Sequence, residues 1–457
     1  MKLFNIASNP RFTVQNNENK NNISFKHRLI LDIGASDPRG SVKILAQTDD
    51  GQDLFEQRGS FLNDTVDGFS SSDNFIDQLS KVIISASKRA VNTIKEKGLN
   101  NEEKKLNGLA LFLPGPIMDD EAIIIANLKT TDGKSLTNVD LSKLENKLKE
   151  NDKSIEVADN LKFIPTKDLG GTGIGIAQIL ANHPKYKDEF KEGFYAVGVM
   201  TGGGFGSVNI QVLDKKYMQI QTSESSHNLA MDTKKNTFTR LGKLGASTKG
   251  ILENYARAMD IKDETSINAL IKTGNARIAT ENRIELDNKK DEDAINVLKG
   301  SKYYNVTNQD KTTTTLQINK YGMETFRTAR KEAIAEYIDT VAQHAITKIN
   351  EGANLLVLTG PLALGLNKTV ASNPEDFGRN TLRELIFDRI DYYIKDDLTC
   401  QQLRKAHNFD LVCDDSVKLA DNTAGGAALL DDKTRIITRR GEWIIIPIDA
   451  LKEESKN

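Results

Sequence analysis

Two strand–turn–strand segments with small, polar tips constrain the fold of this chain more than any other feature. The first is LILDIGASDPRGSVKIL, from Leu29 to Leu45, and the second is FYAVGVMTGGGFGSVNIQVLD, from Phe194 to Asp214. Each joins two apolar strands through a turn of small residues. Asp32 stands inside the first strand, where an ionised carboxylate must face a metal, a hydrogen-bond donor or water. Taken alone, the first segment is equally well explained as a hairpin with a solvated Asp32.

Length and composition limit the classes of protein to which the chain can belong. At 457 residues it exceeds the size of one ordinary core, which predicts two lobes. Lys and Arg number 62 against 64 Asp and Glu, and no basic block indicates a nucleic-acid or membrane surface. The two cysteines, Cys400 and Cys413, are too few for a disulfide framework or a multi-cysteine zinc site. No apolar run is long enough for a membrane span and the start lacks a secretory signal, so we expect a soluble, cytoplasmic protein.

Apolar strands alternate with amphipathic helices along most of the chain. We expect strands over Leu29–Ile33, Val42–Gln47 and Leu54–Leu62, and a helix over Asp73–Lys97. Further strands are expected in LNGLALFLPGP, AIIIANL, LKFIPTKD and ANLLVLTGPLALGLN, and helices in LSKLENKLKEN and DNTAGGAALL. This alternation predicts an α/β protein.

Three segments do not fit the alternation. Residues 1–28 are polar and Asn-rich and are expected to be a flexible N-terminal extension. Residues 262–320 are charged and rich in Thr and Asn, which indicates an insertion, and TNQDKTTTTLQ within them could be a loop or an added hairpin. Residues 431–457 form a C-terminal extension without an assigned role.

The two polar turns suit phosphate. In a duplicated fold they could face each other, and small residues let backbone N–H groups approach phosphate oxygens closely. Asp32 would then lie where a magnesium ion that bridges the phosphates needs an oxygen ligand or a bound water.

The motifs DIGAS, LFLPGP, ANL, KDLGGTG, MTGGGFG, ESSH, LLVLTGP and AGGAALL occur in this order between residues 29 and 430. In that order they resemble the ROK-type sugar kinases, a glucokinase-like branch of the actin/hexokinase/Hsp70 superfamily. The resemblance implies two RNase-H-like, actin-like ATPase lobes with a central cleft, over 29–165 and 166–430, and a helix at Asp421–Leu430 that crosses back toward the first lobe. It implies an ATP- and Mg²⁺-dependent kinase for glucose, another hexose or an amino sugar, and it allows a homodimer.

The resemblance also assigns the catalytic and sugar-binding residues. Asp168, which ends LKFIPTKD, matches the family's general base, although an Asp before a helix also serves as an N-cap. Asp159 in EVADN is the rival base, but no small-residue helix follows it. Asn127, Glu224 and His227 match the family's contacts to sugar hydroxyls. Three departures affect this set: Lys167 replaces an expected Asn, Ser226 replaces an expected Gly, and a Glu expected downstream is missing near Gly245.

The nucleotide contacts follow from the same resemblance. Asp32, with Mg²⁺, Gly34 and Ser36 match the first phosphate turn, and Thr201, Gly202 and Gly203 match the second. Gly360 matches the adenosine contact. Ala35 and Ser36 replace the family's Gly-Thr, and the turn is longer here, which could retune phosphate binding or leave a protein that binds without turnover. Many relatives bind zinc through the matching His and three downstream cysteines, but none follows His227, so no structural zinc is expected.

Other functions explain the sequence less well. GGTGIGIA, at Gly170–Ala177, does not match the dinucleotide fingerprint in any register, and no Walker phosphate loop occurs. The remaining histidines, His27, His183, His344 and His407, and both cysteines are interpreted as structural. A sugar-sensing regulator or inactive relative is the main alternative, but the 28 residues before Leu29 are too few for a helix-turn-helix module. An actin-like filament or chaperone ATPase is the third alternative, and it would not need the sugar-binding residues.

Overall fold

In the computed structural model, the described residues form two compact units. Unit 1 comprises Met1–Ile174, Leu213–Gln221 and Asn422–Asn457, and unit 2 comprises Gly175–Val212 and Thr222–Asp421. The predicted lobe ranges, 29–165 and 166–430, divide the chain differently, and the two-lobed arrangement with a central cleft stays a prediction. The structure describes residues 26–34, 41–61, 68–98, 105–118, 120–150, 155–189, 191, 193–202, 204–213, 216–223, 225, 228–232, 235–247, 250–251, 304–307, 313–316, 323–417, 422–430, 436–437, 443–448 and 451.

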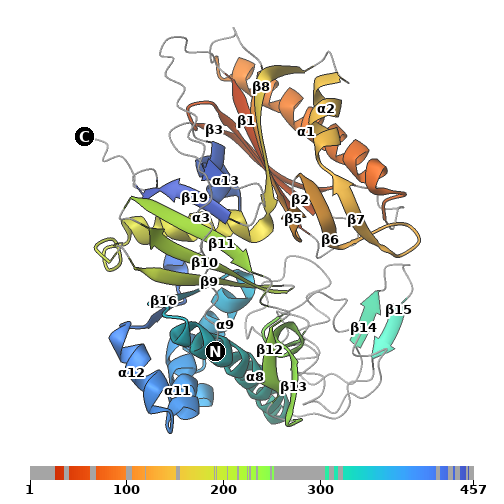
Figure 1. Ribbon diagram of the computed structural model, residues 1–457. Helices are drawn as coiled ribbons and strands as arrows, with labels where there is room; N and C mark the ends of the chain where they lie inside the picture. Colours follow the sequence, from red (N-terminus) through yellow and green to blue (C-terminus); the bar gives the residue numbers. More distant parts are fainter. Residues whose placement is uncertain are drawn as a thin grey trace, which may run out of the picture. The chain divides into compact units, whose positions relative to one another are not determined.

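Unit 1 is built on a five-stranded sheet in the order β3-β2-β1-β4-β8 (Figure 1). Strands β1 (His27–Gly34), β2 (Ser41–Thr48) and β3 (Asp53–Ser60) form an antiparallel meander, in which β2 pairs with β1 and with β3. Strands β4 (Lys105–Leu113) and β8 (Glu156–Lys167) run parallel to β1. The carboxyl ends of β1, β4 and β8 therefore lie at one edge of the sheet.

Helix α1 (Ser72–Glu96) covers one face of this sheet. Its apolar residues recur at helical spacing, and Phe75, Leu79 and Ile83 are fully buried in the core of unit 1. Ser71 caps the helix by accepting the N–H of Asn74. A small sheet of β5 (Ile117–Met118), β6 (Glu121–Lys129) and β7 (Ser135–Asp140) and helix α2 (Ser142–Glu150) complete this part.

Two helices with small residues lie at the carboxyl edge of the unit 1 sheet. Helix α3 (Asp168–Asn182) begins directly after β8, and α13 (Asn422–Leu430) packs on β1 and β4. The packing of α13 on β1 and β4 agrees with the expectation that the helix at Asp421–Leu430 returns to the first lobe. Strands β11 (Tyr217–Ser223), β19 (Trp443–Pro447) and β18 (Ile436–Ile437) lie side by side, so the predicted C-terminal extension contains two strands.

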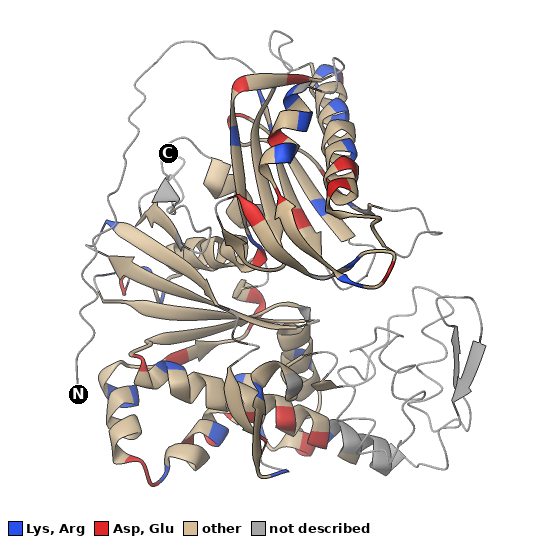
Figure 2. Ribbon diagram, turned by 45° about the vertical axis from the view of Figure 1, so that its right-hand side comes forward, with Lys and Arg blue, Asp and Glu red and all other residues tan. Residues whose placement is uncertain are grey.

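Unit 2 has a second sheet, in which β17 (Asp410–Val412), β16 (Leu355–Thr359), β9 (Tyr195–Thr201) and β10 (Phe205–Leu213) are neighbours in this order. Strands β9, β16 and β17 are parallel, and β10 returns antiparallel to β9. Figure 2 shows β9, β10 and β16 without charged residues, while Lys, Arg, Asp and Glu of this unit are mostly on its helices. Such strands are typical of a sheet buried on both faces.

The helices of unit 2 pack on this sheet and on each other. They are α8 (Met323–Asn350), α9 (Pro361–Ala371), α10 (Pro374–Phe377), α11 (Leu382–Ile394) and α12 (Leu398–Ala406), with short 3₁₀ turns at Leu241–Lys243 and Asp415–Val417. Two hairpins accompany them, β12 (Leu229–Asp232) with β13 (Thr237–Arg240) and β14 (Tyr304–Thr307) with β15 (Thr313–Leu316).

Most of the elements expected from the sequence are confirmed, with three refinements. The first strand begins at His27, two residues before the expected Leu29. The strand expected over ANLLVLTGPLALGLN ends at Thr359, because Pro361 begins α9. Of the two alternatives for TNQDKTTTTLQ, the hairpin is observed in β14 and β15. No described helix combines the length and the apolar character needed to cross a membrane.

Candidate functional site

Asp32 and Asp168 lie at the same edge of the unit 1 sheet. The strand register pairs Asp32 with Phe112 of β4, and Phe112 with Thr166 of β8. Asp168 follows β8 directly and is the first residue of α3. Since β1 and β8 are separated only by β4, the backbones of Asp32 and Thr166 are about 10 Å apart, and Asp168 lies two residues further along the chain. Two acids far apart in the sequence are thus brought together by three parallel strands.

Asp168 and its rival Asp159 occupy different ends of β8. The Asp168 carboxylate is partly buried, and its Oδ1 accepts the N–H of Leu169 at 2.8 Å. Asp159 is exposed near the start of the strand, nine residues earlier, and so lies toward the opposite end of β8 from Asp168. Lys167, which stands where the resemblance expects Asn, is 4% exposed. Only Asp168 therefore shares an edge with Asp32.

Asn422 is a site residue that the sequence interpretation missed. Its Nδ2 donates to Asp32 Oδ1 at 2.9 Å, and its Oδ1 accepts the backbone N–H of Thr172 at 2.8 Å and the Thr172 hydroxyl at 2.9 Å. Asn422 and Thr172 are buried, and Asp32 is partly buried. One amide thus connects the ends of β1, α3 and α13.

Glycines allow this close approach of α3 and α13. A Cβ at Gly171 would lie 2.7 Å from Asn422 Cα and 2.8 Å from the Phe112 ring, and a Cβ at Gly425 would overlap the backbone of Gly171. The small residues in GGTG and AGGAALL were the available sequence signal, because helices whose backbones touch need glycine at the contact. The separation of the two helix starts is therefore set by backbone contact.

Several predicted residues can be placed only in part. Gly34 ends β1 opposite Ser41, whose hydroxyl lies where a Cβ would be. Asn127 belongs to β6, and its side chain lies outside the described atoms. Outside the described residues altogether are Ser36, Gly203, Glu224 and His227. Their roles stay predictions.

In unit 2, Thr201 ends β9, and Gly360 directly follows the neighbouring parallel strand β16. Thr201 is fully buried, and its hydroxyl oxygen lies 3.1 Å from the hydroxyl of Tyr337 on α8. Gly360 has a φ of 92°, and a Cβ there would lie 2.7 Å from the carbonyl oxygen of Thr201. Gly202 begins the turn, and its N–H donates to the carbonyl of Gly204 at 3.1 Å. Gly360 is required by both its conformation and its contacts.

Metal-binding side chains are sparse in the described part of the chain, which holds no group of three or more His, Cys, Asp or Glu that could bind an ion. A dedicated metal cage is thus not formed by those residues. The acids at the unit 1 edge fit a different mode, in which Mg²⁺ keeps several waters and uses one or two carboxylates together with phosphate oxygens. Asp32 and Asp168 supply hard oxygen donors of that kind.

The histidines and cysteines with known positions support their structural interpretation. His27 and His344 are buried, and burial lowers their pKa to about 4 and about 3. Cys400 and Cys413 are buried and unbridged, and burial raises the pKa of the Cys413 thiol to about 12. A thiol with so high a pKa is a poor nucleophile at neutral pH.

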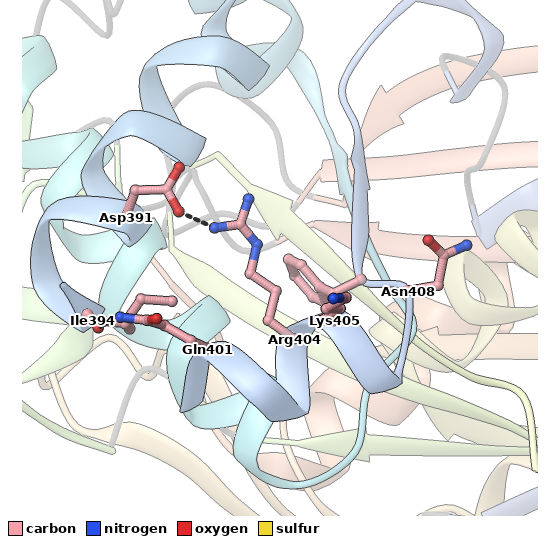
Figure 3. A pocket seen from close by; sticks show the side chains of 7 residues that line it. Asp391, Ile394, Gln401, Arg404, Lys405 and Asn408 are labelled. Atoms are coloured by element: carbon pink, nitrogen blue, oxygen red, sulfur yellow. Dashed lines mark hydrogen bonds and ion pairs between the residues drawn. The ribbon is translucent and has the colours of Figure 1, made fainter. Parts of the chain in front are cut away.

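One pocket of unit 2 lies apart from these residues, between α11 and α12 (Figure 3). It has a volume of about 550 Å³. Arg404 reaches across it to Asp391 and also lies over the Phe387 ring at 4.8 Å. Its lining contains none of the predicted site residues: Asp391, Ile394, Gln401, Arg404, Lys405, Asn408 and Phe409.

The similarity of this chain to known proteins lies in its fold and not in its sequence. No family model and no curated protein matches the sequence. Among solved structures, the glucokinase from Balamuthia mandrillaris in complex with glucose is similar with a TM-score of 0.50 and 13% identity, over 89% of this chain and 94% of that one. The chain has the glucokinase fold. The α/β fold of the actin-like ATPase type, expected from the resemblance to ROK-type sugar kinases, is thereby confirmed.

Two further structures are similar at lower scores. A ROK family transcriptional regulator, a homologue of the E. coli MLC protein, has a TM-score of 0.48 and 13% identity over 88% of this chain and 78% of that one. The glucokinase from Leishmania braziliensis has a TM-score of 0.47 and 13% identity over 88% and 93%.

Proposed function

We propose that this chain is an ATP-dependent sugar kinase that phosphorylates a hexose hydroxyl, with Asp168 as the general base. The observation that carries the proposal is the placement of Asp32 and Asp168 at the carboxyl edge of three parallel strands, in a chain with the glucokinase fold. In open α/β sheets, ligands bind outside the carboxyl ends of the strands. Two strand spacings of about 10 Å, with Asp168 two residues beyond the level of Asp32, leave room for a phosphoryl group between the two carboxylates.

Asp168 is proposed to accept the proton of the attacking hydroxyl. Phosphoryl transfer depends on positioning and charge stabilisation, and a carboxylate near the hydroxyl orients it and removes its proton as the bond to phosphorus forms. The N–H of Leu169 fixes one oxygen of the Asp168 carboxylate. A helix cap would make a similar local contact, so kinetics of a variant must separate the two roles.

Nucleotide contacts are proposed at Asp32, Thr201, Gly202 and Gly360. Asp32 would hold Mg²⁺ directly or through water, and the ion, when bound, neutralises charge on the phosphate oxygens. Thr201 and Gly202 would line the second phosphate turn, where the open space beside Gly202 lets a phosphate approach the backbone. Gly360 would lie against the adenosine, where its missing side chain allows close approach.

The sugar contacts are proposed at Asn127, Glu224 and His227. Amide, carboxylate and imidazole groups can read adjacent hydroxyls as donors and acceptors, which suits the edge of a hexose. The relative from Balamuthia mandrillaris was solved with glucose, so glucose is the first substrate to test. Other hexoses and amino sugars complete the panel.

The test is ADP release across that panel, with wild-type protein and two matched variants. Asp168→Asn should lower kcat by about 10²-fold to 10⁴-fold with little change in KM, because a base acts in the transition state. Asp159→Asn, an equally conservative change on the same strand, should change kcat by less than about twofold, because no transition-state contact is removed there. An active Asp168→Asn variant would move the role of base to another residue.

Two other results would reject a kinase. Sugar binding without ADP release by a folded wild-type protein would favour a sugar-binding regulator or an inactive relative. ATP hydrolysis that no sugar stimulates, together with polymers that sediment, would favour an actin-like ATPase.

A further inference from the structure

The side chain of Asn422 has three hydrogen-bond contacts to residues far away in the sequence. It stands at the start of α13 and is 5% exposed. Its Nδ2 donates to Asp32 Oδ1 at 2.9 Å, and its Oδ1 accepts the backbone N–H and the hydroxyl of Thr172. A buried amide with partners on both sides holds them in one arrangement.

The contact with Thr172 fixes which end of the amide faces Asp32. A backbone N–H can only donate, so the Asn422 atom beside the N–H of Thr172 must be the oxygen. The nitrogen therefore faces the carboxylate, and the bond to Asp32 is charge-assisted. The orientation of Asp32 thus depends on a donor that is itself oriented by α3.

The backbone of α13 that follows Asn422 is held by close contacts. Gly425 contacts the backbone of Gly171 without room for a Cβ, and a Cβ at Gly426 would overlap the side chain of Ile30 on β1. α13 therefore lies directly on α3 and on β1, the strand that carries Asp32. Asn422 is thus anchored to both elements that its side chain joins.

We infer that Asn422 is a positioning residue that orients the Asp32 carboxylate for magnesium-bound nucleotide. The inference rests on the proposed function, in which Asp32 holds Mg²⁺. A neutral amide suits this role, because it donates to one carboxylate oxygen without carrying a positive charge that would compete with the ion. Residues that orient a metal ligand typically contribute a factor of about 10 to 100 in affinity.

A double-mutant cycle tests whether Asn422 acts through Asp32. Binding of the ATP analogue AMPPNP with Mg²⁺ is measured by calorimetry for wild type, Asn422→Ala, Asp32→Ala and the double variant, with the melting temperature of each. Asn422→Ala should weaken binding by about tenfold in the wild-type background and by less than about twofold when Asp32 is already Ala. Without Mg²⁺, wild type and Asn422→Ala should bind the analogue with similar affinity.

Two further variants keep the test decisive. Thr172→Val removes the hydroxyl but keeps the backbone N–H and the contact to Asp32, so it should change binding by less than about twofold. If Asn422→Ala does not fold, Asn422→Leu replaces it in the cycle, because it fills a similar volume without a charge and cannot donate to Asp32.

The outcomes separate the inference from the proposed function. Equal loss of binding in both backgrounds, or loss that persists without Mg²⁺, would make Asn422 merely structural and overturn the inference while the kinase proposal stands. Failure of folded wild-type protein to bind the analogue with Mg²⁺ would overturn the kinase proposal, and the inference with it.

Discussion

Acid sensitivity of unit 1 should depend on His27. Its imidazole is fully buried in β1, where Nε2 lies 2.7 Å from the Ser87 hydroxyl on α1. Within the described residues, Nδ1 has no hydrogen-bond partner. A protonated ring would be a buried cation with a donor that lacks an acceptor, and burial accordingly lowers the pKa from 6.5 to about 4.

The sign and size of the effect follow from linkage. Below pH 6.5 the unfolded chain protonates His27 while the folded chain does not, so the free energy of unfolding falls as the pH drops from 6.5 to about 4 and then levels off. The full difference corresponds to about 3 kcal/mol, of which about 2 kcal/mol is lost between pH 7 and pH 5.

Urea unfolding at about pH 7 and about pH 5 measures this loss. His27→Gln can keep a hydrogen bond to Ser87 but cannot titrate, and it should lose about 2 kcal/mol less than wild type over this interval. Groups other than His27 contribute equally to the loss of stability in both proteins, so their titration cancels in the difference between wild type and His27→Gln.

Equal losses in wild type and His27→Gln would refute the argument. So would an NMR titration in which the His27 ring of the folded protein protonates near pH 6.5, because burial could then not be what disfavours its charged form.

Two further predictions concern the packing around the proposed site. Gly425→Ala should lower the free energy of unfolding in urea by more than about 2 kcal/mol, because its Cβ would overlap the backbone of Gly171. The control is Gly365→Ala, in a helix where the Cβ would meet open space, and this change should be neutral or stabilising by up to about 1 kcal/mol. Tyr337→Phe removes the buried partner of the Thr201 hydroxyl and should cost about 1 to 3 kcal/mol by the same measurement, and unchanged stability would contradict that contact.

The local pattern of the sequence was sufficient to predict most elements. Strand β1 is apolar except at its ends and at Asp32, and α1 repeats its apolar residues at helical spacing, so each was visible within a short window. The turn between β9 and β10 was predicted from its glycines for the same reason. Element ends were predicted less accurately where Pro361 divides one apolar run into a strand and a helix.

The role of Asn422 could not be predicted in this way. Its partners, Thr172 and Asp32, lie 250 and 390 residues earlier, and a hydrogen bond between side chains leaves no periodic pattern in the sequence. The glycine-rich starts of α3 and α13 indicated that each helix has a close neighbour, but not that the neighbours are each other. Such pairing depends on the order of strands in the sheet, which no local window contains.

The choice between Asp168 and Asp159 shows how topology adds to motif order. The sequence predicted a strand from Leu161, which would leave Asp159 in a loop before it, whereas β8 begins at Glu156 and includes Asp159 near its start. In a parallel sheet, residues at opposite ends of one strand reach different edges, so Asp159 faces away from the edge that carries Asp32. Strand direction thus favours Asp168 over Asp159 as the proposed base, and the kinetics of the two Asn variants test that choice.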